Sequence, residues 1–419
     1  MSAVARGTLV GALACQKDAY LKSFSSTVLT CTEIPAPPAS KKKKGAAAPP
    51  DPTPTYKIEL QDTILFPEGG GQPCDFGELV ETESNLKIKV FDVQRENLKA
   101  IHYTHSPLTV GSNVSVNLDW RRRLDNMQQH TGQHLLSAIL DKRQLPTLSW
   151  NMGEVINYLE IPRKLSNDEI KEISQEVNDQ ILSNCSINVE YPDANNNEVN
   201  EEKGIMRVVH IGDLDANPCC GTHLLSTGHI KAIVLLNQFS GKAGTFRINF
   251  ICGDRTINYT SQLHETTKKL MNTLSVNLED LDLKASQTVQ NLKKIQQREN
   301  NLMKELASLK ANELKNNIKN NDKKFIWAYR ADAELDFINN IFKELGDLSD
   351  DVNLVLFTGE TGGNGAIIIS GPKTNEIADK LKTITNLRGG GKGKFQGKVA
   401  EWGKSEIDQV LAYLEQEKC

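Results

Sequence analysis

Long hydrophobic runs are absent from this sequence. No segment approaches the roughly 20 consecutive apolar residues that a membrane-spanning helix requires. The apolar run from Leu9 to Cys15 is short, Asp18 and Lys22 follow it, and no small-residue cleavage site stands nearby, which argues against a secretory signal peptide. Together these absences predict a cytoplasmic protein without a membrane segment.

A disulfide framework of short-spaced cysteines and an excess of positive charge are also missing. The eight cysteines are scattered over 419 residues, which favours reduced thiols over a disulfide framework. The formal net charge of −4 excludes a uniformly basic nucleic-acid binder but leaves room for a local cationic surface. Because single hydrophobic cores rarely grow past about 250–300 residues, a chain of this length is expected to contain several domains.

Glycine and proline are absent from residues 263–315, which predicts a long helical segment. Mostly apolar side chains recur there at alternating intervals of three and four residues, at positions 285, 288, 292, 295, 299, 302, 306 and 309. Thr288 and Glu299 weaken this heptad seam, so the segment favours a helical hairpin or coiled-coil-like linker between domains, with a homodimerisation zipper as the alternative. The chain is therefore expected to be a monomer, or a homodimer through this linker.

Two pairs of metal-binding side chains stand out among the residues that are present. His130 and His134 are four residues apart, and positions i and i+4 share one face of a helix. Cys219 and His223 repeat this spacing around a glycine. Either pair alone is often accidental or simply buried. Three imidazoles and a thiolate together form a zinc ligand set, so the conjunction of the two pairs predicts one zinc ion per chain.

The sequence around these pairs resembles a known family. The segments HTGQHLLSA (130–138) and NPCCGTHLLSTGHI (217–230) resemble the two zinc motifs of the alanyl-tRNA synthetase editing domain. The segment LFPEGGGQP (65–73) resembles the glycine-rich motif that precedes this domain in the larger free-standing editing proteins. DWRRRLDNMQQH (119–130) and RGGGKGKFQGK (388–398) fit the same family. On these motifs the chain is identified as a member of the eukaryotic free-standing alanyl-tRNA editing proteins of the AlaX type.

The resemblance implies a trans-editing hydrolase that binds the acceptor end of tRNA(Ala). Such a protein is expected to remove serine from mischarged tRNA(Ala), with glycine as a second acyl group. No segment remains for an ATP-dependent aminoacylation domain, so no ATP requirement is expected. The alternatives are a non-catalytic, zinc-stabilised RNA-binding protein and an enzyme that edits another aminoacyl-tRNA. One departure is that Cys220 replaces the usual first glycine of C-G-G-T-H, which puts a second thiol beside Cys219.

Hydrolysis of an aminoacyl ester requires an activated water, a polarised carbonyl and a site for the developing oxyanion. Zinc with a free coordination position supplies the first two, but four protein ligands would close the site. Two alternatives stay open: His223 yields to water, or the metal holds the substrate's amino group while a side chain positions water. Thr131 and Gln133 are the predicted catalytic residues, because a hydrogen bond to the serine hydroxyl would disfavour alanine. The alternative for Thr131 is a position on the helix face without a role at the ligand, and the alternative for Gln133 is packing.

Two glycine-rich segments are further candidates for binding. On the family resemblance, a substrate-side role is expected for Gly69, Gly70, Gly71 and Gln72, which read alone would be a flexible turn. Contact with tRNA phosphates, rather than a bare loop, is expected for Arg388, Lys392, Lys394 and Lys398. Arg121, Arg122 and Arg123 are candidates for the acceptor end, with a solvated helix start as the alternative.

The pattern along the chain predicts an α+β multidomain protein that begins with a β-barrel over residues 1–119. Strand-like segments lie at 8–33, 56–66, 86–94 and 112–119. A disordered insertion rich in proline, alanine and lysine interrupts them at 34–55. Lys41–Lys44 within it are expected to be solvated, with contact to RNA phosphate as the alternative.

A zinc-binding α+β editing domain is expected over 120–260, with a first helix at 121–143 and a hairpin within 229–252. Apolar residues spaced for one face of a second helix are Ile170, Ile173, Val177 and Ile181. The helical linker then spans 261–320. A small C-terminal α/β domain is expected over 321–419, and the resemblance implies that it grips tRNA.

Overall fold

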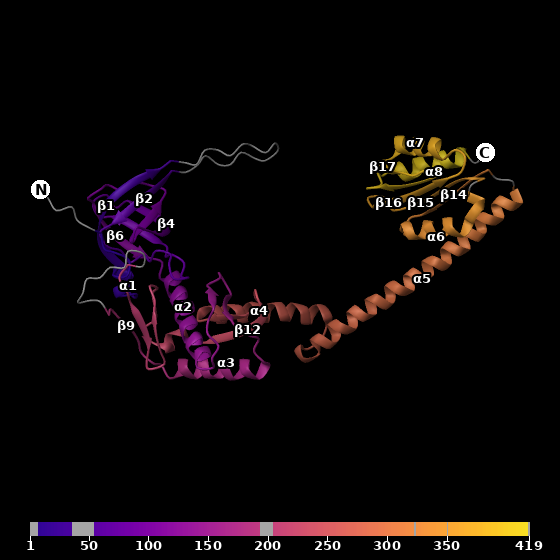
Figure 1. Ribbon diagram of the computed structural model, residues 1–419. Coiled ribbons are helices and arrows are strands. Elements are labelled where there is room, and N and C mark those ends of the chain that lie inside the picture. Colours follow the sequence, from indigo (N-terminus) through magenta and orange to yellow (C-terminus); the bar gives the residue numbers. More distant parts are fainter. Residues whose placement is uncertain (1–6, 36–53, 193–203, 322–323, 350, 418–419) are drawn as a thin grey trace. The chain divides into compact units, whose positions relative to one another are not determined.

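The computed structural model describes residues 7–35, 54–192, 204–321, 324–349 and 351–417. Lys41–Lys44 and most of the predicted insertion lie outside these residues. Contacts between residues divide the chain into two compact units, Met1–Thr267 and Lys268–Cys419 (Figure 1). None of the described helices combines the length and the apolar character needed to cross a membrane. The finer division into four parts stays a prediction.

The first half of unit 1 is a closed barrel of six antiparallel strands, as the sequence predicted, in the order β1-β2-β5-β4-β3-β6. Side chains alternate between the two faces of each strand, so residues such as Val28, Ile58 and Val116 meet in a buried core. The strands β3 and β5 were not predicted. The six strands are β1 (Ser23–Ile34), β2 (Thr55–Leu60), β3 (Gly77–Glu81), β4 (Lys87–Glu96), β5 (Lys99–Thr104) and β6 (Asn113–Leu118).

The predicted strand over residues 8–33 is wrong in its first half. Residues 7–22 form turns and a single helical turn, α1 (Ala14–Lys17). Val10, Leu13 and Cys15 are all buried in the barrel core. A run that buries consecutive side chains lacks the alternation of a half-exposed strand, and here it forms part of the core packing of the barrel.

The second half of unit 1 contains the predicted helices and two small sheets. The helix α2 (Trp120–Asp141) runs from the barrel into this half (Figure 1). The helix α3 (Asn167–Leu182) begins at a capping box of Ser166 and Glu169, and the residues predicted for its apolar face pack into the core, with Ile170 partly buried. The sheets have the orders β11-β10-β9 and β12-β13-β8-β7. Their strands are β7 (Ser149–Asn151), β8 (Asn157–Ile161), β9 (Ile187–Glu190), β10 (Val208–Ile211), β11 (Asp215–Pro218), β12 (Ile233–Ser240) and β13 (Phe246–Cys252).

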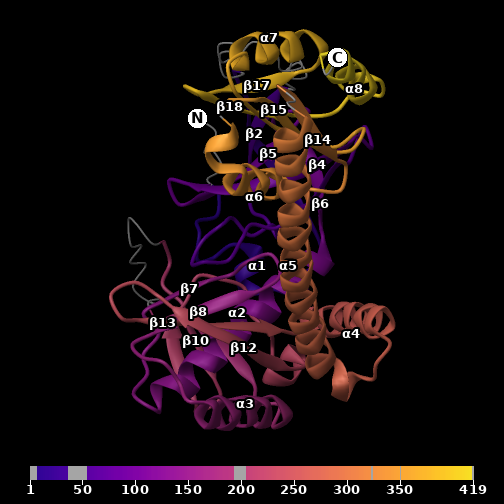
Figure 2. The same ribbon diagram turned by 90° about the vertical axis from the view of Figure 1, so that its right-hand side faces the viewer.

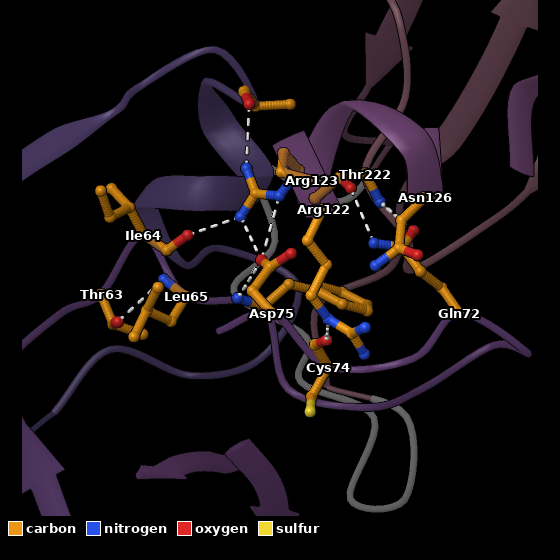
Figure 3. Close-up of polar contacts among 12 residues, drawn as sticks. Thr63, Ile64, Leu65, Gln72, Cys74, Asp75, Arg122, Arg123, Asn126 and Thr222 are labelled. Carbon is orange, nitrogen blue, oxygen red and sulfur yellow. Dashed lines mark hydrogen bonds and ion pairs between the residues drawn. The ribbon is translucent and has the colours of Figure 1, made fainter. Parts of the chain in front are cut away.

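A buried ion pair joins α2 to the loop that follows β2 in the barrel. The Arg123 and Asp75 side chains are both fully buried, and the guanidinium also donates to the carbonyl oxygens of Ile64 (2.6 Å) and Ala19 (2.9 Å) (Figure 3). The Phe66 N–H donates to the same Asp75 carboxylate at 2.7 Å. The neighbouring Arg122 Nε donates to the Cys74 carbonyl at 2.8 Å. These contacts fix the position of the glycine-rich loop against α2.

The segment that lacks glycine and proline is helical, as predicted. It forms α4 (Asp254–Leu274) and α5 (Leu281–Asn321), with the short 3-10 helix η2 (Leu278–Asp280) between them. Leu292, Ile295 and Leu302 of the seam are more than half exposed in the chain. Farther along α5, Ala307 and Ala311 are buried against α6 (Leu335–Leu345). Pairing of the exposed seam in a coiled coil or a dimer stays a prediction.

Unit 2 contains a five-stranded sheet in the order β14-β15-β16-β18-β17. Helix α6 and the end of α5 cover one face, while α7 (Thr374–Ile384) and α8 (Glu406–Gln416) cover the other (Figure 1 and Figure 2). Strands and helices are interspersed, as the predicted α/β domain requires, but β15–β16 and β17–β18 follow each other without a helix between them. Of the strand pairs in this sheet only β14–β15 is parallel. The strands are β14 (Phe325–Arg330), β15 (Asn353–Thr358), β16 (Gly365–Ser370), β17 (Leu387–Gly390) and β18 (Lys394–Val399).

Two features of unit 2 were not predicted. The segment 388–398 forms a β-hairpin, since Arg388 pairs with Lys398 across β17 and β18. Helix α6 was not predicted, although its apolar residues recur at intervals of three and four.

Candidate metal centre and adjoining cavity

The helix α2 presents the first pair of predicted ligands. Asp119 caps its N-terminus by accepting a hydrogen bond from Arg122 N at 3.2 Å. The helix is then regular through His130 and His134, and the i, i+4 spacing puts both imidazoles on one face, with ring centroids 5.2 Å apart. Residues 126–140 of this helix are buried, so both rings lie in the interior of unit 1.

The second pair lies in the turn that follows β11. The Cys219 sulfur is 3.2 Å from His223 Nε2 and 3.4 Å from His130 Nε2. Gly221 lies so close to the first pair that a Cβ there would be 2.3 Å from His130 Cε1. Only glycine fits at this position, which explains the residue between the two ligands. The potential ligand atoms of His130, His134, Cys219 and His223 all lie within 4.8 Å of one another.

Burial sets the protonation states of this cluster. It lowers the pKa of His134 to about 4, and it holds the pKa of His130 and His223 well below the usual range, with further lowering from the neighbouring imidazoles and Arg207. The three imidazoles are therefore neutral at pH 7 and have lone pairs to donate. Burial raises the pKa of the Cys219 thiol to about 12, so a nearby cation is needed to ionise it. This donor set fits a zinc ion.

Thr131 and Gln133 lie on different sides of the cluster. The Thr131 hydroxyl oxygen is fully buried, 3.3 Å from His223 Nδ1, and accepts a hydrogen bond from Leu224 N at 3.1 Å. Thr131 is not among the residues that line the adjoining cavity, whereas Gln133 is. Gln133 Nε2 donates to Ser137 Oγ at 2.9 Å. The contact of either residue with a serine substrate stays a prediction.

A cavity of about 620 Å³ opens beside the four ligands. His130, His134 and Cys219 form part of its wall, and so do Gln133 and Ser137. Ser137 Oγ is 2.7 Å from Thr147 Oγ1, which also lines the cavity. One wall of the cavity therefore carries three of the four potential metal ligands, and another carries amide and hydroxyl groups.

The predicted substrate-side glycines form a tight turn at the edge of this cavity. Gly69 and Gln72 exchange two backbone hydrogen bonds of 3.1 Å, and Gly70 and Gly71 between them have φ of 62° and 81°. Two consecutive positive φ angles require glycine or a similarly permissive residue. A Cβ on Gly70 would be 2.8 Å from the Cys220 sulfur. Gly70 lines the cavity, while Gln72 is fully buried behind it.

Arg207 and Trp150 belong to the site but had no signal in the sequence. Arg207 is 3% exposed, and its Nη1 donates to the carbonyl oxygens of Cys220 (3.0 Å) and Gly221 (2.8 Å), which fixes the ligand turn. The Trp150 ring lies 5.1 Å from that of His130 and lines the cavity. A lone arginine or tryptophan outside any motif acquires such a role only through tertiary packing.

The predicted RNA-binding residues divide between buried and exposed positions. Arg123 was a candidate for the acceptor end, and this prediction is wrong, because its side chain is fully buried against Asp75. Arg121 is exposed. In unit 2, Arg388, Lys392 and Lys398 are exposed on the glycine-rich hairpin. Lys394 is half-buried with its ammonium 4.0 Å over the Phe342 ring, and desolvation lowers its pKa.

The chain is similar to known proteins over nearly its full length. It is 36% identical to the putative alanyl-tRNA editing protein alaX of Saccharomyces cerevisiae, over 97% of this chain and 96% of that protein. It is 31% identical to the alanyl-tRNA editing protein Aarsd1 of Mus musculus, over 96% and 97% of the two chains. The alanine–tRNA ligase of Pyrococcus furiosus matches at 29% identity, over 85% of this chain and 41% of the ligase. Residues 206–249 match the family model of the threonyl and alanyl tRNA synthetase second additional domain.

Proposed function

The chain belongs to the family of free-standing alanyl-tRNA editing proteins and is thus an aminoacyl-tRNA deacylase that acts on mischarged tRNA(Ala), and we propose that it removes chiefly serine and secondarily glycine. We propose further that one zinc ion assists this reaction. The observation that carries this proposal is the convergence of four potential ligands beside a cavity, where His130, His134 and Cys219 form part of the wall and a second wall is polar. A purely structural zinc site has no need of such a cavity.

The four ligand residues support zinc as the metal. Zinc is commonly bound by four nitrogen and thiolate ligands in a tetrahedron, whereas hard cations such as magnesium and calcium prefer oxygen ligands. When bound, zinc would supply Lewis-acid polarisation of the ester carbonyl or a lowered pKa for water. The chain's own contribution is to hold the neutral imidazoles in place, with Thr131 beside His223 Nδ1 and Arg207 on the carbonyl oxygens of the ligand turn.

Specificity for serine is proposed to come from Gln133. Its Nε2 donates to Ser137, which leaves Oε1 without a partner among the described residues. That oxygen can accept a hydrogen bond from a serine hydroxyl in the cavity, whereas alanine would leave it unpaired. We assign Thr131 to the support of His223, because its hydroxyl faces that ring and not the cavity.

The tRNA-binding surface is proposed to lie on the hairpin of β17 and β18. Arg388 and Lys398 are exposed cross-strand partners that line a cavity of about 440 Å³ in unit 2, together with Glu334 and Leu335 at the start of α6. Exposed guanidinium and ammonium groups bind phosphate without reading sequence. Changing Arg388, Lys392 and Lys398 to glutamine should weaken tRNA binding, and each lost phosphate contact should reduce the log–log salt slope by roughly 0.7–0.9.

The direct test is deacylation by the purified protein of Ser-tRNA(Ala), Gly-tRNA(Ala) and Ala-tRNA(Ala). We expect serine to be released fastest, glycine more slowly and alanine least. Binding of all three without deacylation would favour the alternative of a zinc-stabilised RNA-binding protein. Release of an acyl group from a different tRNA only would favour the alternative of another editing substrate.

Two variants separate the roles of the residues between the histidines. Gln133→Met keeps the length of the side chain and removes its polar atoms, so kcat/KM for serine should fall by about threefold to tenfold, the value of one hydrogen bond of about 0.5–1.5 kcal/mol. Residual alanine hydrolysis should be nearly unchanged. Thr131→Val should slow release of both acyl groups equally. Equal losses in Gln133→Met would assign Gln133 to packing.

A further inference from the structure

We propose that Gln72 is a positioning residue of the metal centre: its amide fixes His130 in the tautomer that turns Nε2 toward the other ligands and ties the Cys219–His223 turn to the same point. Gln72 lies in the barrel loop between β2 and β3, 58 residues before His130 and 150 residues before Thr222. The inference rests on the proposed zinc site, and it gives Gln72 a role different from contact with the substrate.

The orientation of the Gln72 amide follows from its contact with the backbone. Thr222 N, an N–H that can only donate, is 3.0 Å from Gln72 Oε1, and Gln72 Nε2 donates to Thr222 Oγ1 at 2.8 Å (Figure 3). The atom that faces the Thr222 N–H must therefore be the amide oxygen. The same oxygen is 2.9 Å from His130 Nδ1.

The tautomer of His130 follows in turn. Because an amide oxygen only accepts hydrogen bonds, His130 Nδ1 must be the protonated nitrogen. In the neutral imidazole the lone pair is then on Nε2, the atom that lies 3.4 Å from the Cys219 sulfur. Ligating histidines generally have their second nitrogen held in this way, which fixes the ring and raises its basicity as a ligand.

Burial excludes a direct contact between Gln72 and a substrate. Its side chain is 0% exposed and does not line the cavity beside the ligands. The Oε1 atom accepts from both His130 and Thr222, which uses its two lone pairs. The turn of Gly70 and Gly71 and the ion pair of Asp75 hold the backbone on either side of Gln72.

Two substitutions test this role. Gln72→Met keeps the volume but removes the acceptor, so zinc affinity should fall by about 10–100-fold, the usual effect of losing an outer-shell partner. Gln72→Glu keeps an acceptor for His130 and Thr222, so its zinc affinity should equal or exceed that of the wild type. The measurement is competition with a chromophoric chelator, together with the visible spectrum of the Co²⁺-substituted protein.

Gln128→Met is the matched control. Gln128 is equally buried on α2, and its amide joins His229 O and Asp254 N without touching a ligand. Its substitution should lower thermal stability comparably while zinc affinity stays unchanged. Equal losses of affinity in Gln72→Met and Gln128→Met, or a Gln72→Glu variant as weak as Gln72→Met, would overturn the proposal.

A measurement on metal-free protein distinguishes this inference from the zinc proposal itself. In histidine-selective ¹⁵N NMR, His130 should carry its proton on Nδ1 in the wild type and in Gln72→Glu, and lose this preference in Gln72→Met. A proton on His130 Nε2 in the wild type would overturn the role of Gln72. Wild-type protein with the expected tautomer but no zinc affinity would overturn the zinc chemistry instead.

Discussion

Neutralising Asp75 should destabilise unit 1 more than any other single charge change that we consider. Its carboxylate is fully buried and pairs with Arg123, which is fully buried as well. Asp75→Asn keeps the shape and removes the charge, so it leaves a guanidinium in the interior with only neutral acceptors, the carbonyl oxygens of Ala19 and Ile64 and the amide oxygen of the new side chain. Removing one partner of a buried pair typically costs about 3–5 kcal/mol.

The structure also indicates that this cost is not the net value of the pair. Asp75 Oδ1 is buried without a hydrogen-bond partner among the described residues, so the carboxylate is incompletely solvated in the folded protein. A large share of the attraction to Arg123 therefore only offsets desolvation. Consequently, the double variant Asp75→Asn/Arg123→Met should be destabilised by much less than the sum of the two single variants.

Thermal and urea unfolding of the full chain, followed by near- and far-ultraviolet circular dichroism, measure these effects. A loss of about 3–5 kcal/mol corresponds to a decrease in Tm of roughly 6–20 °C for a unit of this size. Asp168→Asn is the control, since Asp168 and Lys171 form an ion pair of 3.9 Å with side chains 90% and 80% exposed, and its cost should stay below about 1 kcal/mol. Single effects that add in the double variant to within about 0.5 kcal/mol would refute the coupling.

Three further predictions concern the metal site and the pH dependence of stability. The double variant His130→Ala/His134→Ala removes half of the ligand set, so it should contain no zinc when metal content is measured by mass spectrometry; full retention of zinc would rule out the site. Cys219→Ala should abolish deacylation and zinc binding, whereas Cys220→Gly, which restores the usual family residue at a position in contact with Gly70, should retain both; the reverse result would shift the ligand by one residue. His102 is buried in the barrel between Thr63 Oγ1 and Ile58 O, and burial lowers its pKa to about 4. Between about pH 6.5 and 4, therefore, His102 is protonated in the unfolded state but not in the folded state. Its contribution is present above pH 6.5 and is lost as the pH falls toward 4, by about 1.4 kcal/mol per pH unit; urea unfolding of the wild type and of His102→Gln should differ in slope over this range, and identical slopes would contradict the assignment.

The sequence alone indicated the four residues whose potential ligand atoms come together in the structure, and most of the regular elements near them. The spacing of His130 and His134 is a local property, because a helix puts positions i and i+4 on one face whatever surrounds it. The apolar periodicity of α3 and the alternation of β4 and β6 are local in the same sense. These elements were therefore predictable, and so was the glycine-free helical segment.

The tertiary structure decided which of the candidate residues can meet a ligand. Arg121 and Arg123 are two positions apart in one basic run, yet Arg121 is exposed and Arg123 is buried against Asp75, 48 residues away. Thr131 and Gln133 flank the same glycine, but one contacts His223 and the other lines the cavity. Which face of α2 meets the barrel depends on packing with distant segments, and no local pattern records it.

The role of Gln72 shows the same limit most clearly. The sequence indicated a permissive turn, and the two positive φ angles at Gly70 and Gly71 agree with it. The sequence could not indicate that the next residue would face His130 and Thr222. A hydrogen bond requires two heavy atoms about 3 Å apart in a defined direction, and segments separated by 58 and 150 residues acquire that geometry only when the whole unit has folded.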